Sequence, residues 1–306
     1  MGRALNPAQG DEFIAGVFRD GAGERRYKLF RPSVATMPSA GQRMLVVVLH
    51  GCTQDADDIA RGTRFNEAAA RDGFVVLYPE QAESAHPRKC WNWYVPEQGH
   101  RGAGEAAIIA NLTLKAVREE GIDPKQVYLA GISAGAAMAA NVAAGYPEIY
   151  AAVAFHSGLP AFVANDVASA LAMMSKGPAE SDELGALAFH EMGSHARVVP
   201  VIAFHGVSDP SVSVINLRAV ARQWVVANAL AARVKPPEAV EVQHADRRLS
   251  GLRYALSDGT VLAESWRVDG LAHAWSGGSA AGSYADPKSP DATTMMLQFF
   301  RRHPRP

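Results

Sequence analysis

The sequence has few cysteines and no excess of charge of either sign. Its 306 residues include only two cysteines, Cys52 and Cys90, and no CxxC or Cys/His spacing typical of zinc sites. Two cysteines are also too few for a small fold built on several disulfides. The 30 basic and 31 acidic side chains give a net charge of -1, so we expect no basic surface for nucleic acid or an anionic membrane.

The sequence also lacks a hydrophobic leader and a convincing membrane span. The first ten residues, MGRALNPAQG, contain no apolar run of the kind found in signal peptides. Residues 127–147 carry no charge over 21 positions, which is nominally long enough to cross a bilayer. This stretch is mostly Ala and Gly and includes Ser133 and Asn141, so a buried strand, a turn and a helix explain it better.

Short apolar runs alternate with helical patterns along most of the chain. Such alternation predicts an α/β fold with a mostly parallel central sheet flanked by helices, and we expect a single domain over residues 1–306. At about 161–200 a mainly helical excursion interrupts this alternation. It is either a cap over the edge of the sheet where the active site is expected, or a surface segment without function. We expect strands at 26–31, 44–49, 74–78, 127–130, 151–155, 199–204, 240–243, 252–256 and 263–268, and helices at 57–72, 104–120, 134–144, 213–228 and 291–302.

A G-x-S-x-G motif occurs as Gly131-Ile-Ser133-Ala-Gly135. By chance this pentapeptide occurs in about one chain in ten of this length, so its context decides its meaning. It lies between an expected strand and an expected helix, which is the setting of a nucleophile elbow. There the two glycines allow a sharp turn, and the serine side chain projects at the carboxyl end of the sheet. We therefore predict that Ser133 is a nucleophile.

A serine hydroxyl needs a base to accept its proton, and in elbow enzymes the base follows the acid in the chain. His50 and His156 end strands but precede any suitable acid, and His303 lies in the C-terminal tail. His273 lies in a glycine-flanked loop, residues 270–278, after the last expected strand. We predict His273 as the base.

The acid of such an arrangement is expected in a loop after a late strand. Asp209 follows the apolar strand that ends near His205 and fits this position. Asp258, in Ser-Asp-Gly, is typical of a hairpin turn, and Asp269 is only four residues from His273. We predict Asp209 as the acid that orients His273, with Asp269 as the alternative.

The negative oxygen of an ester transition state needs two preorganised N–H donors. The residue after the nucleophile, Ala134, is expected to supply one backbone N–H. The loop after the strand at 44–49 is expected to supply the other. We assign that donor to the backbone of Cys52, with Gly51 and Thr53 as alternatives.

Taken in order, these motifs resemble the polyhydroxybutyrate (PHB) depolymerase family of esterases, a relative of the feruloyl and acetylxylan esterases. The resemblance covers roughly residues 26–301, and it implies an α/β-hydrolase fold, a Ser133-Asp209-His273 triad and a disulfide between Cys52 and Cys90. The motifs are LHGCTQ (49–54), YPEQ (78–81), CWNW (90–93), GE (104–105), GISAGAAM (131–138), HSGL (156–159), HGVSD (205–209) and GLAHAWSGG (270–278).

The implied disulfide between Cys52 and Cys90 makes physical sense, although two free buried thiols are the alternative. It would close a loop of about 38 residues and stabilise the fold by about 3–4 kcal/mol on the chain-entropy model. Disulfides persist in oxidising compartments, so we expect a secreted or periplasmic protein whose leader is absent from this sequence.

The expected activity is hydrolysis of 3-hydroxyalkanoate esters through an acyl-enzyme, without metal or cofactor. Hydrolysis of feruloyl or acetyl esters of plant polysaccharides is the alternative activity. A protein of this fold that binds a ligand without catalysis is the alternative from outside the enzymes.

Trp91, Trp93 and Trp275 lie in loops that carry these motifs. We predict that they form an apolar wall for the substrate, or else that they anchor loops. The chain ends just after its last expected helix, without a polymer-binding domain, which favours oligomers, amorphous polymer or small esters.

Overall fold

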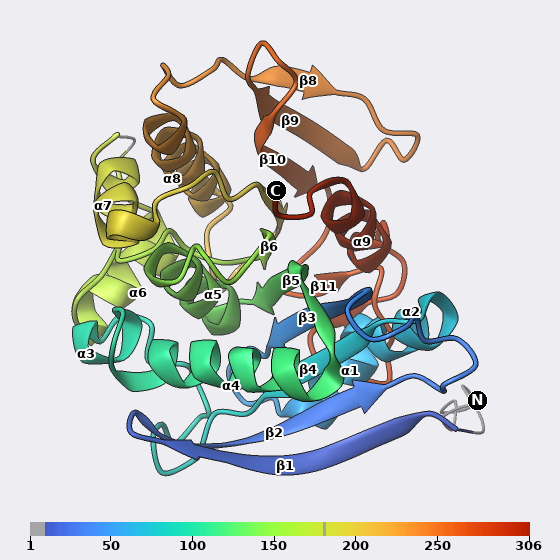
Figure 1. Ribbon diagram of the computed structural model, residues 1–306. Coiled ribbons are helices and arrows are strands. Elements are labelled where there is room, and N and C mark those ends of the chain that lie inside the picture. Colours follow the sequence, from blue (N-terminus) through green and yellow to red (C-terminus); the bar gives the residue numbers. More distant parts are fainter. Residues whose placement is uncertain (1–9, 180–181) are drawn as a thin grey trace.

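The computed structural model describes residues 10–179 and 182–306. Its centre is a ten-stranded sheet with the order β1-β2-β4-β3-β5-β6-β7-β10-β9-β8 (Figure 1). The strands are β1 (Glu12–Asp20), β2 (Gly23–Arg31), β3 (Arg43–Leu49), β4 (Val75–Pro79), β5 (Ile122–Ile132), β6 (Ala152–His156), β7 (Val201–Gly206), β8 (Val240–Val242), β9 (Leu249–Ala255) and β10 (Val261–Val268).

The middle of this sheet is parallel, and its edges are antiparallel. β4, β3, β5, β6, β7 and β10 all run in one direction. β1 and β2 at one edge, and β9 and β8 at the other, pair antiparallel. Strands such as β4 are buried on both faces, which explains their continuous apolar sequences. The predicted mostly parallel α/β fold is confirmed.

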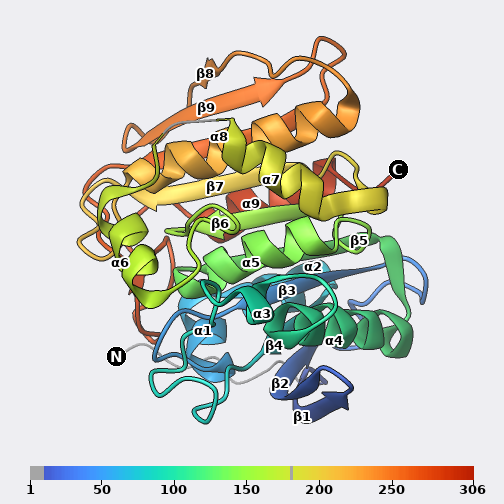
Figure 2. The same ribbon diagram turned by 90° about the vertical axis from the view of Figure 1, so that its left-hand side faces the viewer.

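Helices cover both faces of the sheet (Figure 2). α4, α5, α7 and α8 pack into one apolar core, whereas α1, α2 and α9 pack into the core on the opposite face. The helices are α1 (Ala56–Thr63), α2 (Phe65–Asp72), α3 (Pro96–Gly99), α4 (Gly104–Glu120), α5 (Ala134–Gly145), α6 (Val167–Lys176), α7 (Glu183–Met192), α8 (Ile215–Ala232) and α9 (Ala292–Arg302).

The structure differs from the sequence-based expectation in several features, among them a short helix α3 (Pro96–Gly99) and an earlier start of β5 at Ile122. Residues 57–72 form two helices, α1 and α2, because Arg64 between them has a φ of 63° and ends the first helix. The strand β1 was not predicted, because most of its side chains are exposed and carry no buried apolar run. A small parallel pair, β11 (Trp275–Ser276) and β12 (Ala285–Asp286), also went unpredicted.

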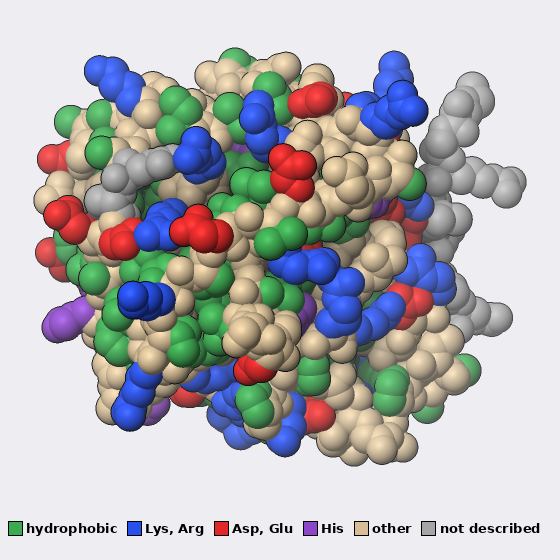
Figure 3. Space-filling model, turned by 90° about the horizontal axis from the view of Figure 1, so that it is seen from above, with side chains coloured by type: hydrophobic (Ala, Val, Ile, Leu, Met, Phe, Trp, Pro, Cys, Tyr) green, Lys and Arg blue, Asp and Glu red, His purple; other side chains and the backbone are tan. Residues whose placement is uncertain are grey.

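Within the described residues of 161–200, which leave out 180–181, the excursion is mainly helical, as predicted, and contains α6, α7 and a short 3₁₀ turn, Gly193–His195. α6 lies beside the carboxyl ends of the central strands (Figure 2). No helix within residues 10–179 and 182–306 is long and apolar enough to cross a membrane. Basic and acidic side chains are interspersed on the face that Figure 3 shows.

The C-terminus of α8 provides a test of backbone strain. Arg233 caps this helix in the left-handed conformation, with φ of 59°, and its side chain is exposed. Glycine adopts this conformation without the steric cost that a β-carbon brings. We expect Arg233→Gly to be about 1 kcal/mol more stable to unfolding than Arg233→Ala, which also loses the charge but keeps the β-carbon. Thermal and urea unfolding of the two variants would measure this, and equal stability would contradict the strain.

Candidate active site

Ser133 lies at a sharp turn between β5 and α5. Its backbone has φ of 56° and ψ of -125°, a combination that costs a non-glycine residue about 1–3 kcal/mol. The two glycines of the motif are required by close packing. A β-carbon on Gly131 would lie 2.5 Å from the backbone of Gly135, and one on Gly135 would lie 2.3 Å from the carbonyl oxygen of Leu49. The turn therefore has the geometry of a nucleophile elbow.

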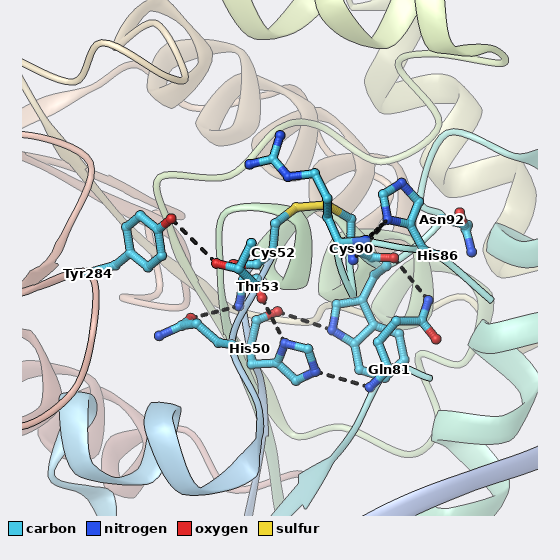
Figure 4. The surroundings of a disulfide bond; sticks show 12 residues. His50, Cys52, Thr53, Gln81, His86, Cys90, Asn92 and Tyr284 are labelled. Carbon is cyan, nitrogen blue, oxygen red and sulfur yellow. Dashed lines mark hydrogen bonds between the residues drawn. A yellow bond between two sulfur atoms is a disulfide. The ribbon is translucent and has the colours of Figure 1, made fainter. Parts of the chain in front are cut away.

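The loop after β3 is held by a buried histidine (Figure 4). The Nδ1 of His50 lies 2.7 Å from the carbonyl oxygen of Gly51, and its Nε2 accepts a hydrogen bond from the backbone N–H of Gln81 at 3.0 Å. This pattern places the proton of the neutral ring on Nδ1. Burial lowers the pKa of His50 to about 4, so the ring is neutral at pH 7. His50 thus positions the proposed oxyanion loop.

Hydrogen bonding distinguishes the three candidate donors of this loop. The N–H of Gly51 donates to Oε1 of Gln54 at 2.9 Å, and the N–H of Thr53 donates to the carbonyl of Arg88 at 2.6 Å. Within the described part of the chain, the backbone N–H groups of Cys52 and Ala134 have no hydrogen-bond acceptor. Both residues line one pocket. This pattern favours Cys52 and Ala134 as the oxyanion donors.

Cys52 and Cys90 form a disulfide, as the resemblance implied, with Cα atoms 4.2 Å apart. The segment that follows Cys90 is anchored from two sides. The indole N–H of Trp91 donates to the carbonyl of His50 at 3.1 Å. The fully buried carboxylate of Glu105 accepts from the backbone N–H of Asn92 at 2.8 Å and from its side-chain amide at 2.7 Å. The disulfide therefore joins the oxyanion loop to a rigid segment.

Asp209 and His273 are hydrogen-bonded, with Oδ2 and Nδ1 2.7 Å apart. Oδ1 of Asp209 accepts from the backbone N–H of Ser211 at 2.8 Å and of Val212 at 2.9 Å. Burial alone would raise the pKa of Asp209, but hydrogen bonds from His205 and His273 hold this pKa well below its usual value. Asp209 is therefore a carboxylate that fixes the His273 proton on Nδ1 and leaves the Nε2 lone pair free.

His156 connects the two halves of the site. Its backbone carbonyl accepts from the N–H of Ser133 at 2.9 Å, and its Nε2 accepts from the N–H of Ser276 at 3.1 Å. Its ring stacks on Trp275 at 5.1 Å. Burial lowers the pKa of His156 to about 3. The sequence shows this residue at a strand end, but only the fold reveals that it supports the loop carrying His273.

Ser133 and His273 line the same pocket, which has a volume of about 480 Å³. Its other walls come from the oxyanion loop, the disulfide, α6 and Tyr284. The apolar part of the lining comprises Trp93, Tyr94, Ile132, Leu159, Val167, Ala170, Leu171, Met174 and Val212. In the described residues no group of three or more His, Cys, Asp or Glu side chains could hold a metal ion. The arrangement combines a serine, a histidine-carboxylate pair and two free N–H groups in one pocket.

Comparison with known proteins identifies the family. A family model described as "Esterase PHB depolymerase" matches residues 26–244. The chain belongs to this PHB depolymerase esterase family. This confirms the resemblance seen in the motifs.

Among curated members, poly(3-hydroxyalkanoate) depolymerase C of Paucimonas lemoignei is 30% identical over 80% of this chain and 58% of its own. Acetylxylan esterase A of Aspergillus oryzae is 30% identical over 52% of this chain and 50% of its own. The chain thus spans about half the length of these relatives. An acetyl xylan esterase from Aspergillus awamori has a similar fold, with a TM-score of 0.70 at 19% identity, covering 86% of this chain and 94% of that chain.

The three tryptophans that were predicted to bind substrate are placed differently in this PHB depolymerase-type esterase. Trp93 lines the pocket, whereas Trp91 and Trp275 are absent from its lining among the described residues. Trp275 is 1% exposed, and its indole N–H donates to Thr293 at 3.0 Å. Its position two residues from His273 puts it on β11, where its side chain points into the core. Trp91 and Trp275 therefore anchor loops, which was the alternative reading.

The pocket also contains side chains that the sequence did not single out. Tyr284 lies edge-on to the His273 ring, with ring centroids 6.2 Å apart, and α6 supplies Val167, Leu171 and Met174. Tyr284 is 11 residues from His273 in the chain and no motif marks it. The helical pattern of α6 gave no indication of which side faces the pocket.

Removing the disulfide is expected to affect both stability and catalysis. For Cys52→Ser with Cys90→Ser, we expect a loss of about 3–4 kcal/mol in unfolding free energy, because the 38-residue separation sets the loop entropy. We also expect kcat to fall more than KM rises, because the N–H of residue 52 loses its fixed position. Urea unfolding and ester kinetics measure the two effects. An unchanged kcat in the folded double variant would remove the link to the oxyanion loop.

Acid is expected to destabilise the protein below pH 6.5 through its buried histidines. The folded-state pKa values of His50 and His156 are about 4 and about 3, below the unfolded value of about 6.5. The unfolded chain therefore binds more protons, and the stability present above pH 6.5 is lost as the pH falls. We expect a loss of about 2 kcal/mol per histidine by pH 5.

Urea unfolding at pH 8, 6.5 and 5 would measure this dependence. His156→Gln is the matched comparison, because it removes one of the two titrating rings and should flatten the profile. A native protein equally stable at pH 8 and pH 5 would contradict the prediction.

Proposed function

We propose that this protein is a carboxylic ester hydrolase that acts on oligomeric or polymeric 3-hydroxybutyrate-type esters through an acyl-enzyme. The observation that carries this proposal is the Asp209-His273 hydrogen bond of 2.7 Å in a pocket shared with Ser133. The free N–H groups of Cys52 and Ala134 lie in the lining of the same pocket. Of the two described serines with positive φ, Ser133 and Ser157, only Ser133 lines this pocket.

The reaction proceeds in two steps. His273 Nε2 takes the proton of Ser133 as Oγ attacks the ester carbonyl carbon, and Asp209 stabilises the resulting imidazolium. The N–H groups of Cys52 and Ala134 bind the oxyanion. His273 then gives its proton to the leaving alcohol, and an acyl-serine remains. Water, deprotonated by His273, attacks this ester. As the second oxyanion collapses, the acid is released and His273 returns the proton to Oγ of Ser133.

The substrate class rests on the pocket and on the relatives. The lining is mainly apolar and about 480 Å³ in volume, which suits short branched acyl units such as 3-hydroxybutyrate. The depolymerase of Paucimonas lemoignei matches a larger share of this chain, 80%, than the acetylxylan esterase of Aspergillus oryzae, 52%. The second candidate is hydrolysis of acetyl or feruloyl esters of plant polysaccharides, which the identity to that acetylxylan esterase supports.

The disulfide bears on the compartment in which the protein works. A bond between Cys52 and Cys90 is stable in oxidising surroundings and is reduced in most cytosols. We propose that the protein functions outside the reducing cytosol, in the periplasm or outside the cell.

Three substrates tested side by side distinguish the candidates. We expect release of 3-hydroxybutyrate from its soluble oligomers, and little release of ferulate from methyl ferulate or of acetate from acetylated xylan. Ser133→Ala should lower kcat by about 10⁴-fold or more, because the nucleophile is lost. Release of ferulate or acetate alone would overturn the polyester proposal. Hydrolysis of all substrates by folded Ser133→Ala would overturn the mechanism.

A further inference from the structure

One positive charge borders the candidate active site. Among the described residues that line the pocket, Arg88 is the only Lys, Arg, Asp or Glu side chain. The guanidinium is exposed and makes no ion pair within the described residues. The adjacent Lys89, by contrast, lies 3.5 Å from Glu83 and does not belong to the lining. The pocket thus carries one uncompensated cation and no carboxylate.

The backbone of Arg88 is fixed to the oxyanion loop. Its carbonyl accepts from the N–H of Thr53 at 2.6 Å, and its own N–H donates to Nδ1 of His86 at 3.1 Å. Two residues further on, Cys90 is joined covalently to Cys52. Figure 4 shows His86 beside Cys90, on the side of the disulfide away from Tyr284. The cation therefore extends from a rigid base next to the proposed oxyanion donor.

A second donor lies beside this cation. Nδ1 of His86 accepts from the N–H groups of both Arg88 and Cys90. The proton of the neutral ring is therefore on Nε2. His86 also lines the pocket. A guanidinium and an imidazole N–H at one rim match the acceptors of a carboxylate.

We propose that Arg88, assisted by His86, binds the free carboxylate of an acid-terminated ester substrate and makes the enzyme prefer short oligomers that end in this group. The inference rests on the proposed function, because an oligomer of 3-hydroxybutyrate ends in a carboxylate close to its last ester bond. In the terminal unit, two carbons separate the ester oxygen from the carboxyl carbon. Methyl ferulate and acetyl esters of polysaccharides carry no such group.

The test compares two substrates that differ only in charge: the linear dimer of 3-hydroxybutyrate and the methyl ester of that dimer. The readout is the ratio of kcat/KM for cleavage of the internal ester, acid over methyl ester. We expect Arg88→Gln to lower this ratio about fivefold, the range of a solvent-exposed ion pair. Lys89→Gln removes a charge one position away and should keep the wild-type ratio. In the wild type the ratio should also fall as salt rises from 0.02 to about 0.5 M, because salt screens exposed charges.

An equal ratio of kcat/KM values in the wild type and in Arg88→Gln would overturn the proposal, as would an equal fall of this ratio in Lys89→Gln.

If the wild type cleaves neither dimer but hydrolyses 4-nitrophenyl acetate, the polyester function fails, and carboxylate binding by Arg88 is tested by itself. The probe is then 3-hydroxybutyrate as a competitive inhibitor of 4-nitrophenyl acetate hydrolysis. An inhibition constant about fivefold higher in Arg88→Gln supports the carboxylate site, and an unchanged constant overturns it.

Discussion

The contact between the start of α5 and the end of β3 determines the rest of the site. A β-carbon on Gly135 would lie 2.3 Å from the carbonyl oxygen of Leu49 and 2.4 Å from that of His50. Only glycine permits this approach, and it holds the elbow against the loop that follows β3. The N–H of Ala134, at the start of α5, and the N–H of Cys52, in that loop, are thereby brought to one pocket. The proposed oxyanion site thus depends on the close packing of α5 against the end of β3.

The strain at Ser133 is sustained by what surrounds it. α5 is buried along its whole length, so relaxing the turn would disturb a large apolar core. The N–H of Ser133 is held by the carbonyl of His156, whose ring in turn accepts from Ser276 in the loop of His273. One residue at the end of β6 therefore holds both the proposed nucleophile and the loop of the proposed base. Because His156 is fully buried and its pKa is lowered to about 3, it keeps this acceptor at neutral pH.

The sequence predicts the parts of this protein whose physical cause is local. Buried parallel strands have continuous apolar sequences, and the elbow requires glycines at a fixed spacing. The central strands of the sheet and the position of Ser133 could therefore be predicted from the sequence. The pairing of Asp209 with His273, 64 residues apart, was predicted from chain order and from the position of each residue in a loop after a strand. Features that depend on tertiary contacts could not be predicted from the sequence. β1 has few buried side chains, and no sequence pattern marks the left-handed conformation of Arg64. Proximity to His273 in the chain was likewise misleading for Trp275, because its side chain packs against Phe65 and His156 in the core.

The distribution of protonation among the histidines explains why His273 can act as the base. His50 and His156 each have one ring nitrogen that accepts a backbone N–H, and burial keeps both rings neutral. His205 is buried as well, with Nε2 2.9 Å from the carbonyl of Val212. None of these three residues lines the pocket. Among these rings, only His273 both pairs Nδ1 with a carboxylate and lines the pocket with Ser133, so it is the ring placed to take the proton of Ser133.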